Sequence, residues 1–141
     1  MQKAKGVFDN GSGASFRPVI SLVASDARGE IFSISLPDNR ELMLLHSVKG
    51  SKRGGHSHSV QESVMVLTGK MRYHKKGRDG QRLERNFVLE AGQESHTAAG
   101  VVHMAEFLED TWLIELKDAK IGEWEQFNYQ PWRDLVEGKH G

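Results

Sequence analysis

Short apolar segments separated by turn-forming residues fill most of this chain, and this pattern limits the folds that it can adopt. Clusters of Gly, Asp, Asn and Lys separate the segments at the spacing typical of antiparallel strands. Phe32, Ile34 and Leu36 alternate with polar residues, so they share one face of a strand. An all-β fold follows, and a barrel or jelly roll is favoured because closing the sheet removes exposed edges. The expected strand segments are residues 17–24, 30–36, 41–48, 62–68, 70–75, 82–90, 101–109 and 111–117.

Turn and helix signals agree with this prediction. Residues 75–81, KKGRDGQ, place two glycines and an Asp-Gly step between two alternating segments, which predicts a β-hairpin. In the second of these segments, Leu83, Phe87 and Leu89 share one face. A helical signal is confined to PWRDLVEG, where Pro131 suits the first turn. The expected organisation is a flexible N-terminal segment over residues 1–15, a barrel over 16–128 and a C-terminal helix or tail over 129–141.

Composition narrows the classes of function. The chain has 141 residues, which is enough to bury a core, and its 19 basic and 19 acidic side chains balance to zero net charge. A neutral chain has no general attraction to nucleic acid or to an anionic membrane. The absence of Cys excludes disulfides, thiolate ligands and a cysteine nucleophile, leaving imidazole and carboxylate. No apolar run approaches the roughly 18 residues of a membrane span, and MQKAKGVFDN lacks the apolar region of a secretory signal. We expect a soluble, cytoplasmic protein with a small-molecule partner.

Residues 50–69, GSKRGGHSHSVQESVMVLTG, carry the strongest chemical signal. His56 and His58 are two residues apart, so on an extended chain both imidazoles point to one face and can enter one cavity. The three residues after His58 are long enough for a turn that brings Glu62 back beside the imidazoles. A later segment, GQESHTAAGVVHMAEF, places His103 in a strand-like run.

These two segments resemble the two sequence motifs of the cupin superfamily. The first motif, G-x5-H-x-H-x3-E-x6-G, is matched at every specified position by Gly50, His56, His58, Glu62 and Gly69. The second, G-x5-P-x-G-x2-H-x3-N, is matched by Gly92, Gly100 and His103, whereas Ala98 and Phe107 replace its Pro and Asn. The resemblance covers residues 50–107. It implies a double-stranded β-helix, which is the jelly-roll barrel of single-domain sugar-epimerase cupins.

The resemblance further implies a metal inside the barrel, bound by His56, His58, Glu62 and His103. Three neutral nitrogens and one carboxylate suit divalent Fe, Mn, Ni, Zn or Cu, and a six-coordinate ion would keep two open positions. Some cupins have lost the metal and use the same cavity only for binding, so that alternative stays open.

Two shorter strings resemble the nucleotide-sugar cupins, which include dTDP-sugar ketoisomerases and epimerases. Residues 26–30, DARGE, and 53–58, RGGHSH, match their D-x-R-G-x and R-G-x-H-x-H strings. In this resemblance Arg53 and Arg28 pair with a diphosphate. His56 or His58 is then a general base beside a carbonyl. Because a metal-bound histidine has committed the lone pair that a base needs, metal-dependent and metal-free chemistry are alternatives.

The expected function is an enzyme acting on a small oxygenated or sugar-like substrate, with His58, Glu62 and Arg53 as the candidate catalytic residues. The alternatives are a metal-independent nucleotide-sugar ketoisomerase or epimerase, a metal-dependent dioxygenase or lyase, and a non-catalytic binding or sensor protein. We also expect a homodimer. Aromatic residues near the C-terminus suit core or dimer packing, and these are Trp112, Trp124, Phe127, Tyr129 and Trp132.

Other titratable side chains are expected to lie away from the site. His46 suits the core or the rim of the cavity, His74 the solvent side of a strand and His96 a loop. Glu106 and Glu115 fall in strand segments, where carboxylates more often lie on the outer, solvated face.

Overall fold

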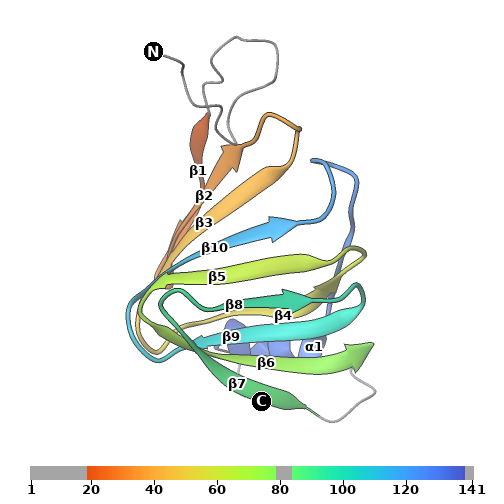
Figure 1. Ribbon diagram of the computed structural model, residues 1–141. Coiled ribbons are helices and arrows are strands. Elements are labelled where there is room, and N and C mark those ends of the chain that lie inside the picture. Colours follow the sequence, from red (N-terminus) through yellow and green to blue (C-terminus); the bar gives the residue numbers. More distant parts are fainter. Residues whose placement is uncertain (1–18, 79–83, 139–141) are drawn as a thin grey trace.

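The computed structural model describes residues 19–78 and 84–138 and shows two antiparallel sheets with one helix at the C-terminal end (Figure 1). The all-β jelly roll and the short C-terminal helix predicted from the sequence are confirmed. The segment over residues 1–15 lies outside the described residues. The elements are β1 (Ile20–Asp26), β2 (Gly29–Ser35), β3 (Glu41–Ser47), β4 (Lys52–His58), β5 (Glu62–Thr68), β6 (Lys70–Arg78), β7 (Arg85–Glu90), β8 (Glu94–Thr97), β9 (Val101–Phe107), β10 (Thr111–Lys117), β11 (Gln126–Asn128) and α1 (Gln130–Val136).

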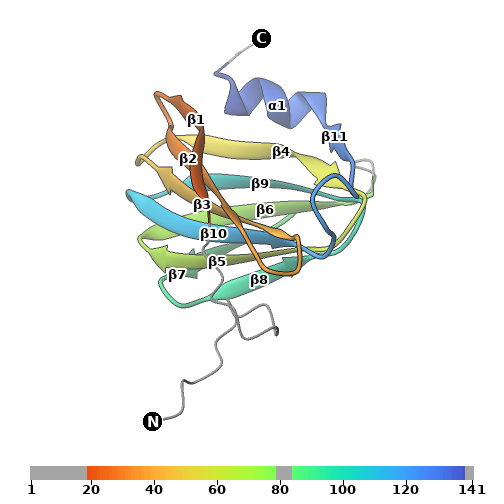
Figure 2. The same ribbon diagram turned by 90° about the horizontal axis from the view of Figure 1, so that it is seen from above.

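The strands divide into two sheets that face each other. Sheet A has the order β1-β2-β3-β10-β5-β8, and sheet B has the order β11-β4-β9-β6-β7. Consecutive strands such as β4 and β5 belong to different sheets, so the chain passes repeatedly from one layer to the other (Figures 1 and 2). This crossing topology is the double-stranded β-helix, and it brings distant segments of sequence side by side.

The inner faces of the two sheets share one hydrophobic core. Full burial of a Val, Leu, Phe or Met side chain in this core stabilises the fold by about 1.5–3 kcal/mol. Ile31 and Met43 pack at the edge of this core, next to the space that holds the polar site. The buried members are Leu45, Val64, Val66 and Leu113 from sheet A, and Met71, Tyr73, Leu89, Ala105 and Phe107 from sheet B.

The alternation expected in residues 30–36 is present, but its apolar face points away from the core. Ile31 packs against the core, so its neighbours Phe32 and Ile34 lie on the outer face of sheet A. The ring of Phe32 stacks on Trp112 with a centroid distance of 6.5 Å, and Trp112 is 38% exposed. β2 therefore carries apolar side chains on both faces of sheet A.

Pairing of β6 with β7 confirms the predicted hairpin, although residues 79–83, which include Leu83, lie outside the described part of the chain. Two short strands were not expected. β8 pairs with β5, so His96 lies in a strand and not in a loop, with its side chain 54% exposed. β11 pairs with β4. At four and three residues, these strands are too short to show a periodic pattern in the sequence.

Helix α1 covers part of the outer face of sheet B (Figure 2). Pro131 lies in its first turn as predicted. Trp132 and Val136 pack on Val102 and Met104 of β9, forming a second buried cluster. No helix within the described residues is long and apolar enough to cross a membrane.

Candidate metal centre

A glycine pair in β4 brings Arg53 and two histidines to the same side of the sheet. In a regular strand Arg53 would point away from His56, because an odd spacing places side chains on opposite faces. The pairing of β4 with β9 shifts between Gly54 and His56, and this bulge reverses the alternation. Gly54 and Gly55 have φ angles of 95° and 78°, a region that glycine adopts without steric cost. A Cβ on Gly54 would lie 2.8 Å from the carbonyl oxygen of His103, so the bulge depends on glycine.

Strands β4 and β9 gather three imidazoles inside the barrel. His56 lies opposite His103 across the two strands, and His58 follows on the same side. One ring nitrogen from each histidine lies within 4.8 Å of the others. The ring centroids are 4.6, 4.8 and 5.0 Å apart. The structure therefore brings together all three histidines that the cupin motifs single out.

Three buried imidazole nitrogens of this cluster have no hydrogen-bond partner among the described residues: His56 Nδ1, His58 Nδ1 and His103 Nε2. The Nδ1 of His103 donates to the carbonyl of Val101 at 3.1 Å, which leaves the lone pair on Nε2 free to bind a metal. An unsatisfied buried group costs about 1–3 kcal/mol. A cation bound between these atoms would remove that cost, so the donor set fits a metal.

Burial keeps the three imidazoles neutral. Desolvation, reinforced by the neighbouring imidazoles, lowers the pKa of His56 to about 2 and that of His58 to about 3. Desolvation also lowers the pKa of His103 to about 4, against the opposing hydrogen bond to Val101. Neutral imidazole is the form that binds a metal. Groups with such low pKa values are weak bases near neutral pH, which favours a ligand role over a general-base role.

Glu62 lies against this cluster and also forms a charged pair. Its Oε1 is 3.4 Å from His103 Nε2, and its Oε2 is 3.7 Å from His58 Nδ1. The same Oε2 is 3.1 Å from the Nζ of Lys117, whose ammonium group lies 4.2 Å from the ring centre of Trp124. Glu62 is 1% exposed. Its carboxylate can reach the space between the imidazoles, but it is also ion-paired with Lys117.

Glu115 lies inside the barrel, which corrects the expectation of an outer position. It shares the inner face of β10 with Leu113 and Lys117, and all three line the cavity. Burial, followed by the charge of Glu62, raises the pKa of Glu115 to about 8. Glu115 therefore carries its proton at neutral pH. The alternation of β10 misleads here, because its apolar residues Trp112, Ile114 and Leu116 share the outer face and leave Glu115 on the inner one.

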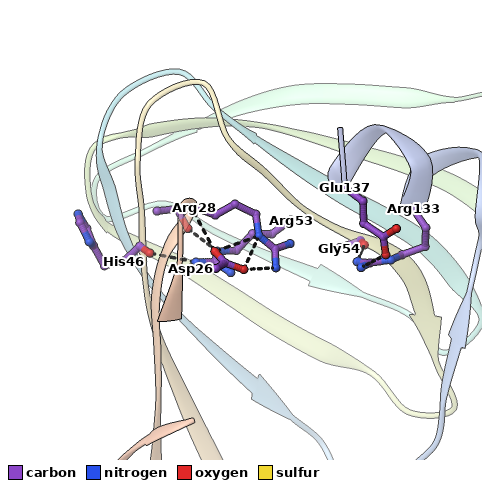
Figure 3. Close-up of polar contacts among 8 residues, drawn as sticks. Asp26, Arg28, His46, Arg53, Gly54, Arg133 and Glu137 are labelled. Carbon is purple, nitrogen blue, oxygen red and sulfur yellow. Dashed lines mark hydrogen bonds and ion pairs between the residues drawn. The ribbon is translucent and has the colours of Figure 1, made fainter. Parts of the chain in front are cut away.

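A cavity of about 330 Å³ lies between the sheets, beside the imidazoles. Arg53 lines it and is 7% exposed. The Nε of Arg53 donates to the hydroxyl of Ser47 at 2.7 Å, and its Nη2 donates to the carbonyl of His46 at 3.2 Å (Figure 3). Burial and the nearby charge of Arg28 lower the pKa of Arg53. The guanidinium therefore donates its hydrogen bonds to neutral acceptors, the Ser47 hydroxyl and the His46 carbonyl.

Two further arginines line the same cavity, and both are paired. Arg28 contacts the carboxylate of Asp26 at 2.7 Å, and Arg133 contacts Glu137 at 2.9 Å (Figure 3). Arg133 also donates to the carbonyl of Gly54 at 2.7 Å. Over residues 19–78 and 84–138, Arg53 has no such ion pair. A buried guanidinium that no carboxylate contacts directly favours the binding of an anion.

His46 and His74 have partners outside the cavity. His46 bonds Glu30 at 2.7 Å on the outer face of sheet A and stacks on Trp112. His74 is half-buried, with Nε2 3.5 Å from Glu106, which lies on the outer face as expected. Sequence reasoning did not single out Tyr73, a buried residue that lines the cavity with its ring 5.9 Å from His103.

Comparison with known proteins shows which solved structures share this architecture. No family model matches the sequence, and no curated protein matches it. Among solved structures, the capsular polysaccharide assembling protein CapF from Staphylococcus aureus is 19% identical over 81% of this chain, with a TM-score of 0.64. A deletion mutant of Bacillus subtilis oxalate decarboxylase OxdC is 17% identical over 82%, with a TM-score of 0.66. The 7S globulin of Momordica charantia is 12% identical over 77%, with a TM-score of 0.65. This chain spans 33%, 31% and 35% of those three chains. At these identities the likeness establishes architecture alone, and the chain has the cupin fold that its two motifs predicted.

Proposed function

We propose that this protein binds a divalent transition metal through His56, His58 and His103, with Glu62 as the fourth ligand. The observation that supports this most is the convergence of three buried imidazole nitrogens that have no hydrogen-bond partner. Three neutral nitrogens and a carboxylate suit Fe, Mn, Ni, Zn or Cu. Such an ion, when bound, supplies Lewis-acid or redox chemistry at a substrate oxygen.

The substrate we propose is a small oxygenated anion bound in the cavity beside the imidazoles. Arg53 supplies a buried positive charge that is hydrogen-bonded to neutral acceptors, and a guanidinium can bind a carboxylate or phosphate through two parallel hydrogen bonds. Arg53 would orient the substrate, and Trp124 and Tyr73 would enclose it. A volume of about 330 Å³ suits a small molecule. Oxalate, named in one of the similar structures, belongs to this class.

The main alternative is a metal-free nucleotide-sugar ketoisomerase or epimerase. Arg28 and Arg53 both line the cavity, as that resemblance requires, and CapF assembles a capsular polysaccharide. In this alternative His58 would act as the base, but burial lowers its pKa to about 3, so it would be a weak base at neutral pH. A dioxygenase or lyase reaction would need the metal, and a sensor would need only the anion site.

Metal titration of the apo protein tests the ligand set. We expect one equivalent of Mn, Fe, Ni, Zn or Cu per chain, measured by calorimetry and by elemental analysis after gel filtration. His58→Ala should lose this binding. His96→Ala is the matched control, because His96 is exposed on β8. A wild-type protein that takes up none of these ions would contradict the proposal.

Thermal-shift measurements with oxalate, inorganic phosphate and dTDP test the substrate class. We expect stabilisation by a small anion that Arg53→Gln abolishes. Arg72→Gln is the control, because Arg72 hydrogen-bonds Asn86 at 2.9 Å and does not line the cavity. Stabilisation by dTDP alone would favour the nucleotide-sugar alternative. A cytoplasmic location and a homodimer, both expected from the sequence, stay predictions.

A further inference from the structure

The outer face of sheet A carries two continuous rows of apolar side chains. In antiparallel sheets, residues opposite each other point to the same face, so the pairing register defines each row. The first row is Ile20, Ile34, Leu42, Leu116 and Ser63. The second row is Leu22, Phe32, Leu44, Ile114 and Met65. Within these rows Ser63 is the one polar side chain.

The strands of this sheet have the sequence character of strands buried on both sides. β3 contains the run Leu42 to Leu45, and β5 contains the run Val64 to Leu67. Strands with one solvated face alternate between apolar and polar residues, whereas continuous apolar runs are typical of strands covered on both faces. The inner residues of these runs face the core, which leaves the outer ones in need of a cover.

Exposure is greatest at the free edge of the sheet. On β1, Ile20, Leu22 and Val23 are 62%, 58% and 54% exposed, and Val19, just before the strand, is 64% exposed, so the described residues leave this edge uncovered on both faces. Trp112 and Leu67 add exposed apolar surface on β10 and β5. Single exposed apolar residues are ordinary, but a contiguous apolar patch marks an interaction surface.

The size of this face matches one side of a stable dimer. β1, β2, β3, β10 and β5 are adjacent, and at about 4.8 Å between strands they form a face about 24 Å wide. Each has 7 residues, which extend about 23 Å at about 3.3 Å per residue. Two such faces would bury at least about 1,100 Å², and specific interfaces begin near about 1,000 Å².

We propose that the outer face of sheet A is the interface between two copies of this chain, related by a two-fold axis. An isologous interface needs one self-complementary patch, and two apolar sheet faces can pack on each other about 10 Å apart. Charges at the ends of the face are paired locally, as in Glu30 with His46 and Glu94 with His96. The two rows contain no charged side chain that would require a partner of opposite charge. A second copy of this chain supplies a surface of the same shape and polarity.

Sedimentation velocity of the purified protein over a range of micromolar concentrations tests this interface. We expect a wild-type dimer. Ile114→Lys, in the second row, should weaken the dimer at least about 100-fold, because it places an unpaired ammonium in an apolar interface. Leu22→Lys, on the exposed edge strand, should also weaken it and leaves the core untouched. Leu135→Lys is the control, because Leu135 is 39% exposed on α1 and should leave the dimer intact.

Circular dichroism shows whether each variant keeps its β structure. A folded Leu22→Lys monomer beside a dimeric Leu135→Lys supports the proposal even if Ile114→Lys fails to fold. A wild-type monomer at every concentration overturns the proposal. If the backbone amides of the outer face of sheet A exchange slowly in that monomer, residues 1–18 of the same chain would be the segment that covers the face. A dimer that survives in both folded face variants also overturns the proposal, whatever the state of Leu135→Lys.

Discussion

The two sheets of this barrel share one core but differ on both of their faces. Sheet B presents three neutral imidazoles to the cavity, and α1 of the same chain covers part of its outer face. Sheet A presents Glu62, Glu115 and Lys117 to the interior, and no described residue covers its apolar outer face. Sheet B therefore combines the three imidazoles of the proposed metal site with a cover from its own chain. Sheet A holds the buried carboxylates, with Glu62 as the proposed fourth ligand, and the proposed contact with a second copy.

Removing the cover of sheet B has the largest expected effect. Trp132→Ala should lower the free energy of unfolding by about 3–5 kcal/mol, because it deletes a buried aromatic side chain and leaves a cavity over β9. Urea denaturation measures this loss. Leu135→Ala, on the exposed side of α1, should cost less than about 0.5 kcal/mol. Equal losses in the two variants would mean that α1 does not stabilise sheet B by packing.

The predictable parts of this molecule are those that short-range spacing encodes. His56, His58 and Glu62 lie within one strand–turn–strand unit, so their proximity follows from local geometry. Arg53 is different, because its entry into the cavity depends on a bulge at two glycines that simple alternation does not predict. Glu115 was misplaced because the apolar residues of β10, Trp112, Ile114 and Leu116, face outward, which is the reverse of what alternation alone predicts.

Variants of the proposed ligands on the two sheets should lower metal affinity by different amounts. His103→Ala should lower the affinity at least about 100-fold, because one of three convergent nitrogens is lost. Glu62→Gln should lower it about 10- to 100-fold, since Lys117 already shares that carboxylate and becomes unpaired in the variant. Calorimetry with Zn or Ni measures both. Wild-type affinity in Glu62→Gln would remove Glu62 from the ligand set.

The pH dependence of stability should show the two sheets acting in opposite directions. Burial raises the pKa of Glu115 from 4.5 to about 8, so between these values the folded state keeps a proton that the unfolded chain has lost, and stability falls as pH rises. The histidine pKa values are lowered from 6.5 to between about 2 and about 4, so the unfolded chain binds more protons below pH 6.5. Stability there falls as pH falls. The metal-free protein should be most stable near pH 6.5.

Glu115→Gln tests the alkaline side of this profile. One proton changes the free energy of unfolding by at most about 1.4 kcal/mol per pH unit, so the wild type should lose stability as the pH rises from 6.5 towards 8. The variant should lose little over this range and should keep the acid side unchanged. Denaturation of the metal-free protein at a series of pH values gives both sides. Glu94→Gln, exposed on β8, is the matched control. An alkaline decline that persists in Glu115→Gln would place its origin in another group.

Salt should have the smallest effect on the proposed dimer. The two rows on the outer face of sheet A contain no charged side chain, so screening has nothing to weaken there. Raising the salt concentration tenfold should change the dimer dissociation constant by less than about 2-fold. Anion binding at Arg53 should weaken over the same range, because it depends on charge. Sedimentation and thermal-shift measurements in the same buffers compare the two responses. A dimer that dissociates as salt rises would be held by charged groups, which lie beyond these rows.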